Sequence, residues 1–308
     1  MLWSEIDNMK DMFNKKSKEG HKLKLVSFKK KITLLFRKFF PRLSKQLFFD
    51  FMVKKKGLIQ RINDINLLVL GSSHAKCGFN CNIIQNSFNL GTDNQDLYTS
   101  YVLLKSYISN MKNLRTVVLF YSLFSSGLEL GKTTCDKDIC LHHYIFDVPY
   151  SSACIPKYKG AYKHRLKKFN DSMINYENFS GYIPSDVIEE QNVDAVYDRV
   201  YHHMRENKRK PSQNTYLDQI YKLCEDFNVQ LKIVIAPLRK DFIDILRFQN
   251  YSIDDLFKDV YLWAQKRKIL IKNYLASSDF EHSDFKDCDH LNASGASKLT
   301  ALIIQQLL

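Results

Sequence analysis

Short apolar runs alternate with helix-like segments along most of the chain. Residues 66–70 form an apolar run that stops at Gly71, so we expect a buried strand that ends in a tight turn. Residues 116–121, rich in β-branched and aromatic side chains, are the strongest strand signal. Further strands are expected at 87–90, 231–236 and 269–274. The pattern therefore predicts a sheet of five short strands.

Segments with apolar residues three or four positions apart lie between these strands and predict helices. They cover residues 96–111, 212–227, 252–266 and 293–308, with Ser212 expected as the N-cap of the second. Strands separated by helices are typical of an α/β three-layer sandwich with a mainly parallel sheet. We expect the flavodoxin-like strand order 2-1-3-4-5, with the ligand beyond the carboxyl ends of the strands.

One region does not fit this plan. Residues 123–211 separate two expected strands by far more than an ordinary crossover loop. We interpret this region, rich in tyrosine and histidine, as an insertion that shapes the substrate cleft. The paired histidines at 142–143 and 202–203 lack metal-ligand spacing, and we expect them to face substrate or solvent.

The positive charge of the chain is concentrated at its beginning. The whole chain carries 46 Lys+Arg and 33 Asp+Glu, a net charge of +13. Residues 1–60 hold 16 of the basic and 5 of the acidic residues, so residues 61–308 hold 30 and 28. This near-neutral body argues against nucleic-acid binding. We therefore divide the chain into a basic N-terminal extension, 1–60, and a main domain, 61–308.

The segment 23–56 interleaves apolar and basic residues at spacings that suit an amphipathic helix. In the first interpretation, this helix contacts an anionic membrane or a membrane protein. In the second, it packs its apolar stripe on the body, or the segment is partly disordered in isolation. The sequence has neither a secretory leader pattern nor an apolar run of about 20 residues that could span a bilayer. We expect a cytoplasmic protein, peripheral to the inner membrane face under the first interpretation.

The cysteine spacings and the lack of a nucleotide-binding signature argue against a bound metal or cofactor. Seven cysteines are present, an odd number without a Cys-x-x-Cys pair, and their spacings do not match zinc sites. We expect them to be reduced thiols. Because the sequence also lacks a nucleotide-binding signature, we predict neither a metal nor a cofactor.

Two short motifs carry candidate chemistry. In the first, Gly71-Ser72-Ser73-His74 follows the first expected strand, where a glycine turn would expose the next side chains above the sheet. Ser73 is the candidate nucleophile, and the plainer alternative is an N-cap for the following helix. We expect His74 to lie on the surface of that helix.

The second motif, Asp287-Cys288-Asp289-His290, precedes the last expected helix. A carboxylate three residues before a histidine can hold the imidazole by its Nδ1–H, while Nε2 faces a serine. Asp287 has this spacing to His290, whereas Asp289 does not. The alternative is a polar helix cap with an incidental surface histidine.

Together these motifs resemble the SGNH (GDSL-type) hydrolase superfamily. In that family a Gly-Asp-Ser turn follows the first strand and an Asp-x-x-His block precedes the terminal helix; residues 71–73 and 287–290 are similar, with Ser72 in place of the aspartate. Asn89-Leu90-Gly91 is similar to the second family block, and the resemblance spans residues 66–308. It implies a triad of Ser73, Asp287 and His290, with the amides of Ser73 and Gly91 in an oxyanion hole.

One departure concerns the third family block, whose asparagine completes the oxyanion hole. Phe124 stands at that position, so Ser122, Ser125 or an insertion residue substitutes, or the activity is weak or absent. Related chains with Gly-Ser-Ser in the first block include acyl-transfer proteins of cell-envelope polymers and proteins of polysaccharide gene clusters. The resemblance implies a serine-dependent esterase or O-acyltransferase acting on a glycan or another acylated substrate. The alternative is a non-catalytic glycan-binding or polysaccharide-assembly module on the same fold.

Overall fold

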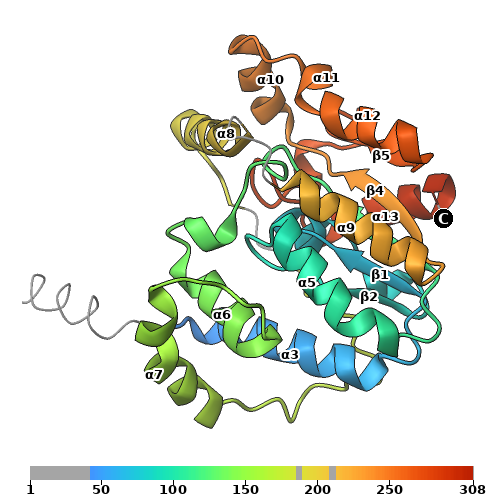
Figure 1. Ribbon diagram of the computed structural model, residues 1–308. Coiled ribbons are helices and arrows are strands. Elements are labelled where there is room, and N and C mark those ends of the chain that lie inside the picture. Colours follow the sequence, from blue (N-terminus) through green and yellow to red (C-terminus); the bar gives the residue numbers. More distant parts are fainter. Residues whose placement is uncertain (1–41, 185–188, 208–212, 308) are drawn as a thin grey trace, which may run out of the picture.

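Five parallel strands form one sheet at the centre of the computed structural model, which describes residues 42–184, 189–207 and 213–307 (Figure 1). The strands are β1 (Leu67–Leu70), β2 (Ser87–Asn89), β3 (Thr116–Phe120), β4 (Gln230–Ile235) and β5 (Ile271–Asn273). Their order across the sheet is β2-β1-β3-β4-β5, and every neighbouring pair is parallel. The predicted α/β fold and its strand order are confirmed.

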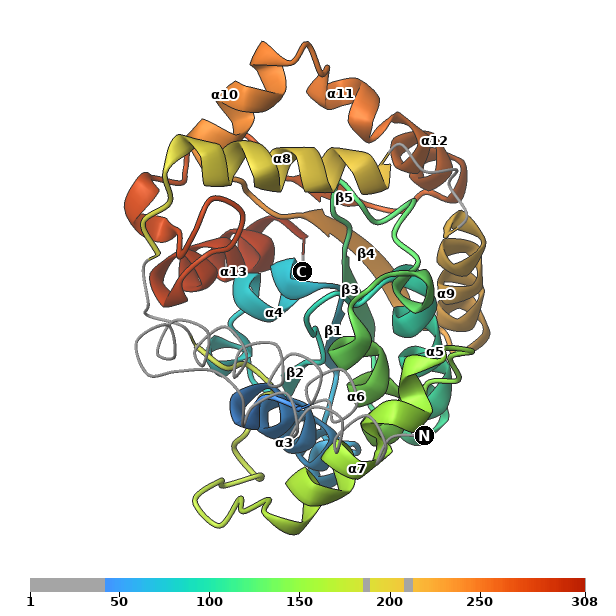
Figure 2. The same cartoon turned by 90° about the vertical axis from the view of Figure 1, so that its left-hand side faces the viewer.

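Side chains of the central strands alternate between two apolar layers. In β1, Leu68 and Leu70 join one buried cluster, whereas Leu67 and Val69 join the other. The helices α5 (Leu97–Tyr107), α9 (Asn214–Asp226) and α12 (Lys258–Arg267) cover the first face, and α4 (Ser73–Gly78) and α13 (Ala293–Leu307) cover the second (Figures 1 and 2). Burial on both faces explains why the strands are continuous apolar runs in the sequence.

The helices differ from the sequence prediction mainly where turns interrupt them. The helix expected at 96–111 is α5 followed by the 3-10 turn η2 (Ile108–Asn110). The helix expected at 252–266 is divided into α11 (Ile253–Leu256) and α12. Sequence reasoning missed α10 (Lys240–Phe248), whose buried Phe242, Ile243 and Leu246 lie three and four positions apart. Ser212 lies outside the described residues.

The insertion contributes to the core as well as to the region of the candidate site. It contains the 3-10 turn η3 (Leu130–Lys132) and the helices α6 (Asp136–Phe146), α7 (Cys154–Lys167) and α8 (Val193–Asn207). In α6, Nε2 of His142 lies 2.7 Å from Thr92 Oγ1, and its Nδ1 lies 2.8 Å from the carbonyl oxygen of Asp138. His142 is fully buried, so the expectation that it faces substrate or solvent is wrong.

The first described helix, α3 (Lys45–Arg61), belongs to the same core. Its Phe48, Phe51 and Leu58 are buried in the cluster that also holds the first face of the sheet. The domain boundary placed at residue 60 therefore falls inside a packed helix, and residues 45–60 are part of the body. Residues 1–41, which carry most of the predicted amphipathic segment, lie outside the described residues.

Two further expectations concern the whole chain. Within the described ranges, every helix is too short or too polar to cross a membrane. All seven cysteines fall in these ranges and are free thiols, with the sulfur atoms of Cys140 and Cys154 3.6 Å apart.

Gly71, between β1 and α4, allows the turn that leads to Ser73. Its φ is +136°, and an added Cβ would lie 2.8 Å from Cβ of Phe120 and 2.9 Å from its carbonyl oxygen. Gly71→Ala is therefore expected to lower the free energy of unfolding by more than about 2 kcal/mol. Urea unfolding measures this change. The matched control is Gly160→Ala in α7, where no atom lies within 4 Å of the added methyl group and a gain of about 0.5–1 kcal/mol is expected.

Candidate active site

The two adjacent serines of the first motif have different environments. Ser72 is buried, and its side chain accepts the backbone N–H of His74 at 3.4 Å, which makes it the N-cap of α4. Ser73 is the first residue of the helix and is partly exposed. Both alternatives of the sequence analysis are thus present side by side, with the cap on Ser72 and the accessible hydroxyl on Ser73.

His290 of the second motif contacts Ser73, although the two residues are 217 positions apart in the sequence. Nε2 of His290 lies 2.7 Å from Oγ of Ser73. On the other side of the ring, Nδ1 of His290 lies 2.9 Å and 3.0 Å from the two carboxylate oxygens of Asp287. The three residues predicted as a triad are therefore brought together, in the order and with the ring orientation that a serine–histidine–carboxylate relay requires.

The local conformation of the loop holds Asp287 in place. Its Oδ1 accepts the backbone N–H groups of Asp289 at 3.0 Å and of His290 at 2.8 Å. This turn connects the 3-10 turn η4 (His282–Asp284) to α13, and Asp287 is buried. Because two backbone donors hold the same carboxylate oxygen, the local turn orients Asp287 toward the imidazole.

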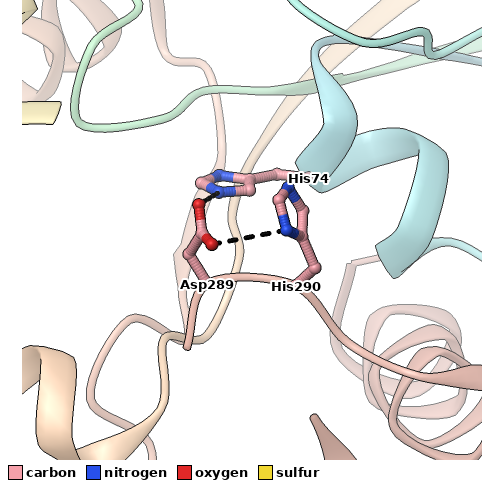
Figure 3. A group of neighbouring side chains, drawn as sticks. All are labelled: His74, Asp289 and His290. Atoms are coloured by element: carbon pink, nitrogen blue, oxygen red, sulfur yellow. Dashed lines mark ion pairs between the residues drawn. The ribbon is translucent and has the colours of Figure 1, made fainter. Parts of the chain in front are cut away.

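A second buried carboxylate, Asp289, lies beside the triad. Its oxygens lie 3.0 Å from Nε2 of His203, 3.3 Å from Nε of Arg199, 3.3 Å from Nδ1 of His290 and 3.7 Å from Nε2 of His74. Figure 3 shows the carboxylate between the rings of His74 and His290. Four nitrogen-bearing side chains therefore surround one buried carboxylate.

These charges set the protonation of the site. Burial acts to lower the pKa of His290, but the charges of Asp289 and Asp287 outweigh it and hold this pKa above its ordinary value. Burial lowers the pKa of His74 to about 4, so this ring is neutral at neutral pH. For Asp289, burial acts to raise the pKa, but the neighbouring imidazoles hold it well below its usual range.

Several members of this network were not predicted. His74 is only 4% exposed, and its Nδ1 lies 2.7 Å from Oγ of Ser122, so the expected place on the helix surface is wrong. His203 is also buried, contrary to expectation, whereas His202 is exposed. The buried positions Val196, Val200 and His203 of α8 lie four and three residues apart, and this helical periodicity is the signal that indicates His203.

The expected oxyanion hole is only partly present. The N–H of Gly91 donates to Oδ1 of Asn89 at 2.9 Å, so the structure does not aim it at a substrate as expected. The N–H of Ser73, at the first position of α4, has no acceptor inside the helix and remains the available donor of the predicted pair. Asn89 instead locks the end of β2 to α4, because its amide also donates to the carbonyl oxygens of Ala75 and Phe79.

The residues expected to replace the absent asparagine have other partners. The Oγ of Ser122 contacts His74, and Oγ of Ser125 accepts the backbone N–H of Ser122 at 2.8 Å. The ring of Phe124 packs against the imidazoles of His74 and His203, with centroids 5.6 Å and 4.9 Å apart. Phe124 therefore packs against the buried imidazoles and offers no side-chain hydrogen-bond donor at the position of the family asparagine.

One group of side chains has the chemistry to hold a metal ion. Ligand atoms of His74, Asp289 and His290 lie within 4.8 Å of one another in the part of the chain that the structure describes. An ion there would compete with Asp287 for Nδ1 of His290, which already lies 2.9 Å away. We therefore assign these three residues to the hydrogen-bonded surroundings of the triad.

Two comparisons with known proteins give no match. No model of a known protein family matches the chain, and no curated protein matches it.

Proposed function

We propose that this protein is a serine-dependent acyl-ester hydrolase or O-acyltransferase of the SGNH type. The observation that carries the proposal is the unbroken chain of contacts from Ser73 Oγ to His290 Nε2, at 2.7 Å, and from His290 Nδ1 to Asp287, at 2.9 Å. A serine hydroxyl is a weak nucleophile until a base removes its proton, and a base needs a carboxylate to fix its tautomer. Both conditions are met by side chains of this chain.

In the proposed reaction, Oγ of Ser73 attacks the carbonyl carbon of an ester while Nε2 of His290 takes the hydroxyl proton. The negative charge that develops on the carbonyl oxygen lies near the N-terminus of α4, where the N–H of Ser73 is available. The bond from carbon to the leaving oxygen then breaks, and that oxygen takes the proton from His290. The acyl group remains on Ser73 as an ester.

The second half of the reaction distinguishes the two activities. His290 removes a proton from water or from a sugar hydroxyl, whose oxygen attacks the acyl-serine; the bond to Oγ breaks and Ser73 recovers its proton. Water gives a hydrolase, and a sugar hydroxyl gives an O-acyltransferase. Both use the same three residues, so the two are separated by adding a glycan acceptor and comparing acyl transfer with release of the free acid.

The substrate proposal, a glycan or another acylated molecule, rests on the resemblance of the Gly-Ser-Ser block to proteins of cell-envelope polymers. A second candidate function, a non-catalytic glycan-binding or polysaccharide-assembly module, is favoured by the oxyanion region. The amide of Gly91 and the hydroxyls of Ser122 and Ser125 all have partners within the protein. Losing one oxyanion donor typically costs a factor of about 10²–10³ in turnover.

A fluorophosphonate probe separates the two candidates. An activated Ser73 is expected to form one covalent adduct, which intact mass and peptide mapping locate. The adduct should disappear in Ser73→Ala and persist in Ser72→Ala, which keeps the neighbouring hydroxyl. If the folded wild-type protein takes no label, and its glycan binding survives Ser73→Ala, the binding module is correct and the enzyme proposal fails.

A further inference from the structure

A hollow of about 600 Å³ lies between α3 and the end of α7. Its wall combines aromatic and basic side chains, namely Phe48, Phe49, Phe169, Lys45, Arg165 and Lys168. Within the described residues, none of these side chains is hydrogen-bonded or ion-paired to Ser73, Asp287 or His290. The hollow is therefore a feature of its own, formed by the first described helix and the insertion.

The helix beside this hollow carries positive charge that the fold does not neutralise. Over its length α7 contains five Lys or Arg and no Asp or Glu. Lys159, Lys163 and Lys167 follow one another at intervals of four, so they form one exposed stripe. Within the described residues, no ion pair involves these three lysines. In contrast, Lys56 of α3 is paired with Asp171 at 2.7 Å.

Two apolar side chains are exposed in the same region, Leu166 three positions after Lys163 on α7 and Met173 at the hollow. Met173, at the hollow, is 93% exposed, and Leu166 of α7 is 43% exposed. Unpaired lysines beside exposed apolar groups are typical of surfaces that lie on anionic membranes, where the charges attract headgroups and the apolar groups enter the interface. A nucleic acid would use the lysines but would leave Met173 without a role.

The chain enters the body at the same place. Nε of Arg165 in α7 donates to the carbonyl oxygen of Leu43 at 2.8 Å, two residues after the segment 1–41. That segment carries 11 Lys+Arg against 4 Asp+Glu. It therefore has the same sign of charge as α7 and does not complement it, which argues for an occupant of opposite charge from outside the chain.

We propose that this surface, the α3–α7 face (Lys45, Lys159, Lys163, Lys167, Lys168, Leu166 and Met173), docks on an anionic phospholipid bilayer. The lysine stripe contacts the headgroups, and Met173 and Leu166 enter the boundary with the acyl chains. The proposal is independent of the ester chemistry at Ser73. It also assigns the membrane contact to a described surface of the body in addition to the N-terminal segment.

Vesicle co-sedimentation of the full chain tests the charge component. The wild-type protein is expected to bind vesicles of phosphatidylglycerol mixed with phosphatidylcholine, weakly at high salt, and not to bind pure phosphatidylcholine. Lys159→Glu, Lys163→Glu and Lys167→Glu together should weaken binding by at least about tenfold. The matched control replaces three other exposed lysines by glutamate, Lys222 on α9 and Lys258 and Lys266 on α12. The helices α7 and α12 lie at opposite ends of the molecule (Figures 1 and 2). This control is expected to bind within about twofold of the wild type.

A second pair of variants tests the apolar component. Met173→Asp should weaken vesicle binding, because it places a charge where the side chain enters the interface. Phe248→Asp, at a 76% exposed position of α10, changes charge equally and should not weaken it. Neither side chain is buried, so unfolding by urea should be unchanged in both.

Three results would overturn the proposal. The first is equal weakening by the α7 and control triple variants, which would make the attraction nonspecific. The second is unchanged binding in the α7 variant, which would assign all membrane contact to another segment. The third is binding of homopolymeric RNA, lost in the α7 variant, by a protein that does not bind the anionic vesicles.

Discussion

Replacing Ser73 by alanine is expected to lower the turnover of p-nitrophenyl acetate by a factor of about 10⁴–10⁶. The reason is that the hydroxyl 2.7 Å from His290 Nε2 is the nucleophile that we propose, and no other described hydroxyl contacts that nitrogen. The loss should appear in kcat, because alanine leaves the surrounding surface intact. Stopped-flow or steady-state release of p-nitrophenolate measures it.

Ser72→Ala is the matched control for this prediction. Ser72 caps α4 through the N–H of His74, so its removal should cost about 1 kcal/mol of stability and less than about tenfold in turnover. A folded Ser73→Ala protein with wild-type turnover would falsify the assignment of the nucleophile. If Ser72→Ala instead abolished turnover and labelling, the nucleophile would be Ser72.

The second largest effect is expected for Asp287→Asn, a loss of about 10⁴-fold in kcat. An asparagine keeps the shape of the side chain but donates where the carboxylate accepts, so it favours the wrong tautomer of His290. The two carboxylate oxygens that now lie 2.9 Å and 3.0 Å from Nδ1 would no longer hold the proton there. The measurement is kcat for the same ester, with urea unfolding as the check on folding.

Asp289→Asn provides the comparison, because Asp289 lies 3.3 Å from Nδ1 and is otherwise held by His203 and Arg199. We expect a loss of less than about tenfold in kcat, because the contact between Nδ1 of His290 and Asp287 stays in place. The base must be neutral, so kcat/KM rises with pH through the pKa of His290. Removing the negative charge of Asp289 lowers this pKa and moves the acid limb of the profile to lower pH. If Asp289→Asn is the more damaging of the two, Asp289 is the triad acid.

The contacts of Asp289 change the interpretation of the insertion. Arg199 and His203 come from α8, and both reach the carboxylate next to the triad. From the sequence, we expected the insertion to shape the substrate cleft. The structure shows in addition that α8 contacts the loop that carries Asp287 and His290, so packing of the insertion and orientation of the His290 imidazole are connected.

Some features of this protein follow from local sequence alone. Strand residues 117–120 are apolar on both faces of the sheet. The three-residue spacing of Asp287 and His290 brings carboxylate and ring together within one turn. The strand order agrees with the flavodoxin-like order expected for a chain in which strands alternate with helices. These predictions succeeded because each depends on neighbours in the chain or on chain topology.

Other features were decided only by tertiary packing. The sequence does not show that Ser72 caps α4, nor that the N–H of Gly91 already donates to Asn89. It likewise does not reveal that His74 and His203, 129 positions apart, flank one buried Asp289. The hydrogen-bond partner of a buried polar group comes from an element that is distant in the sequence. The periodicity of one segment therefore does not reveal which partner it has. The sequence by itself therefore determined the fold and the three candidate catalytic residues, and the tertiary structure decided what surrounds them.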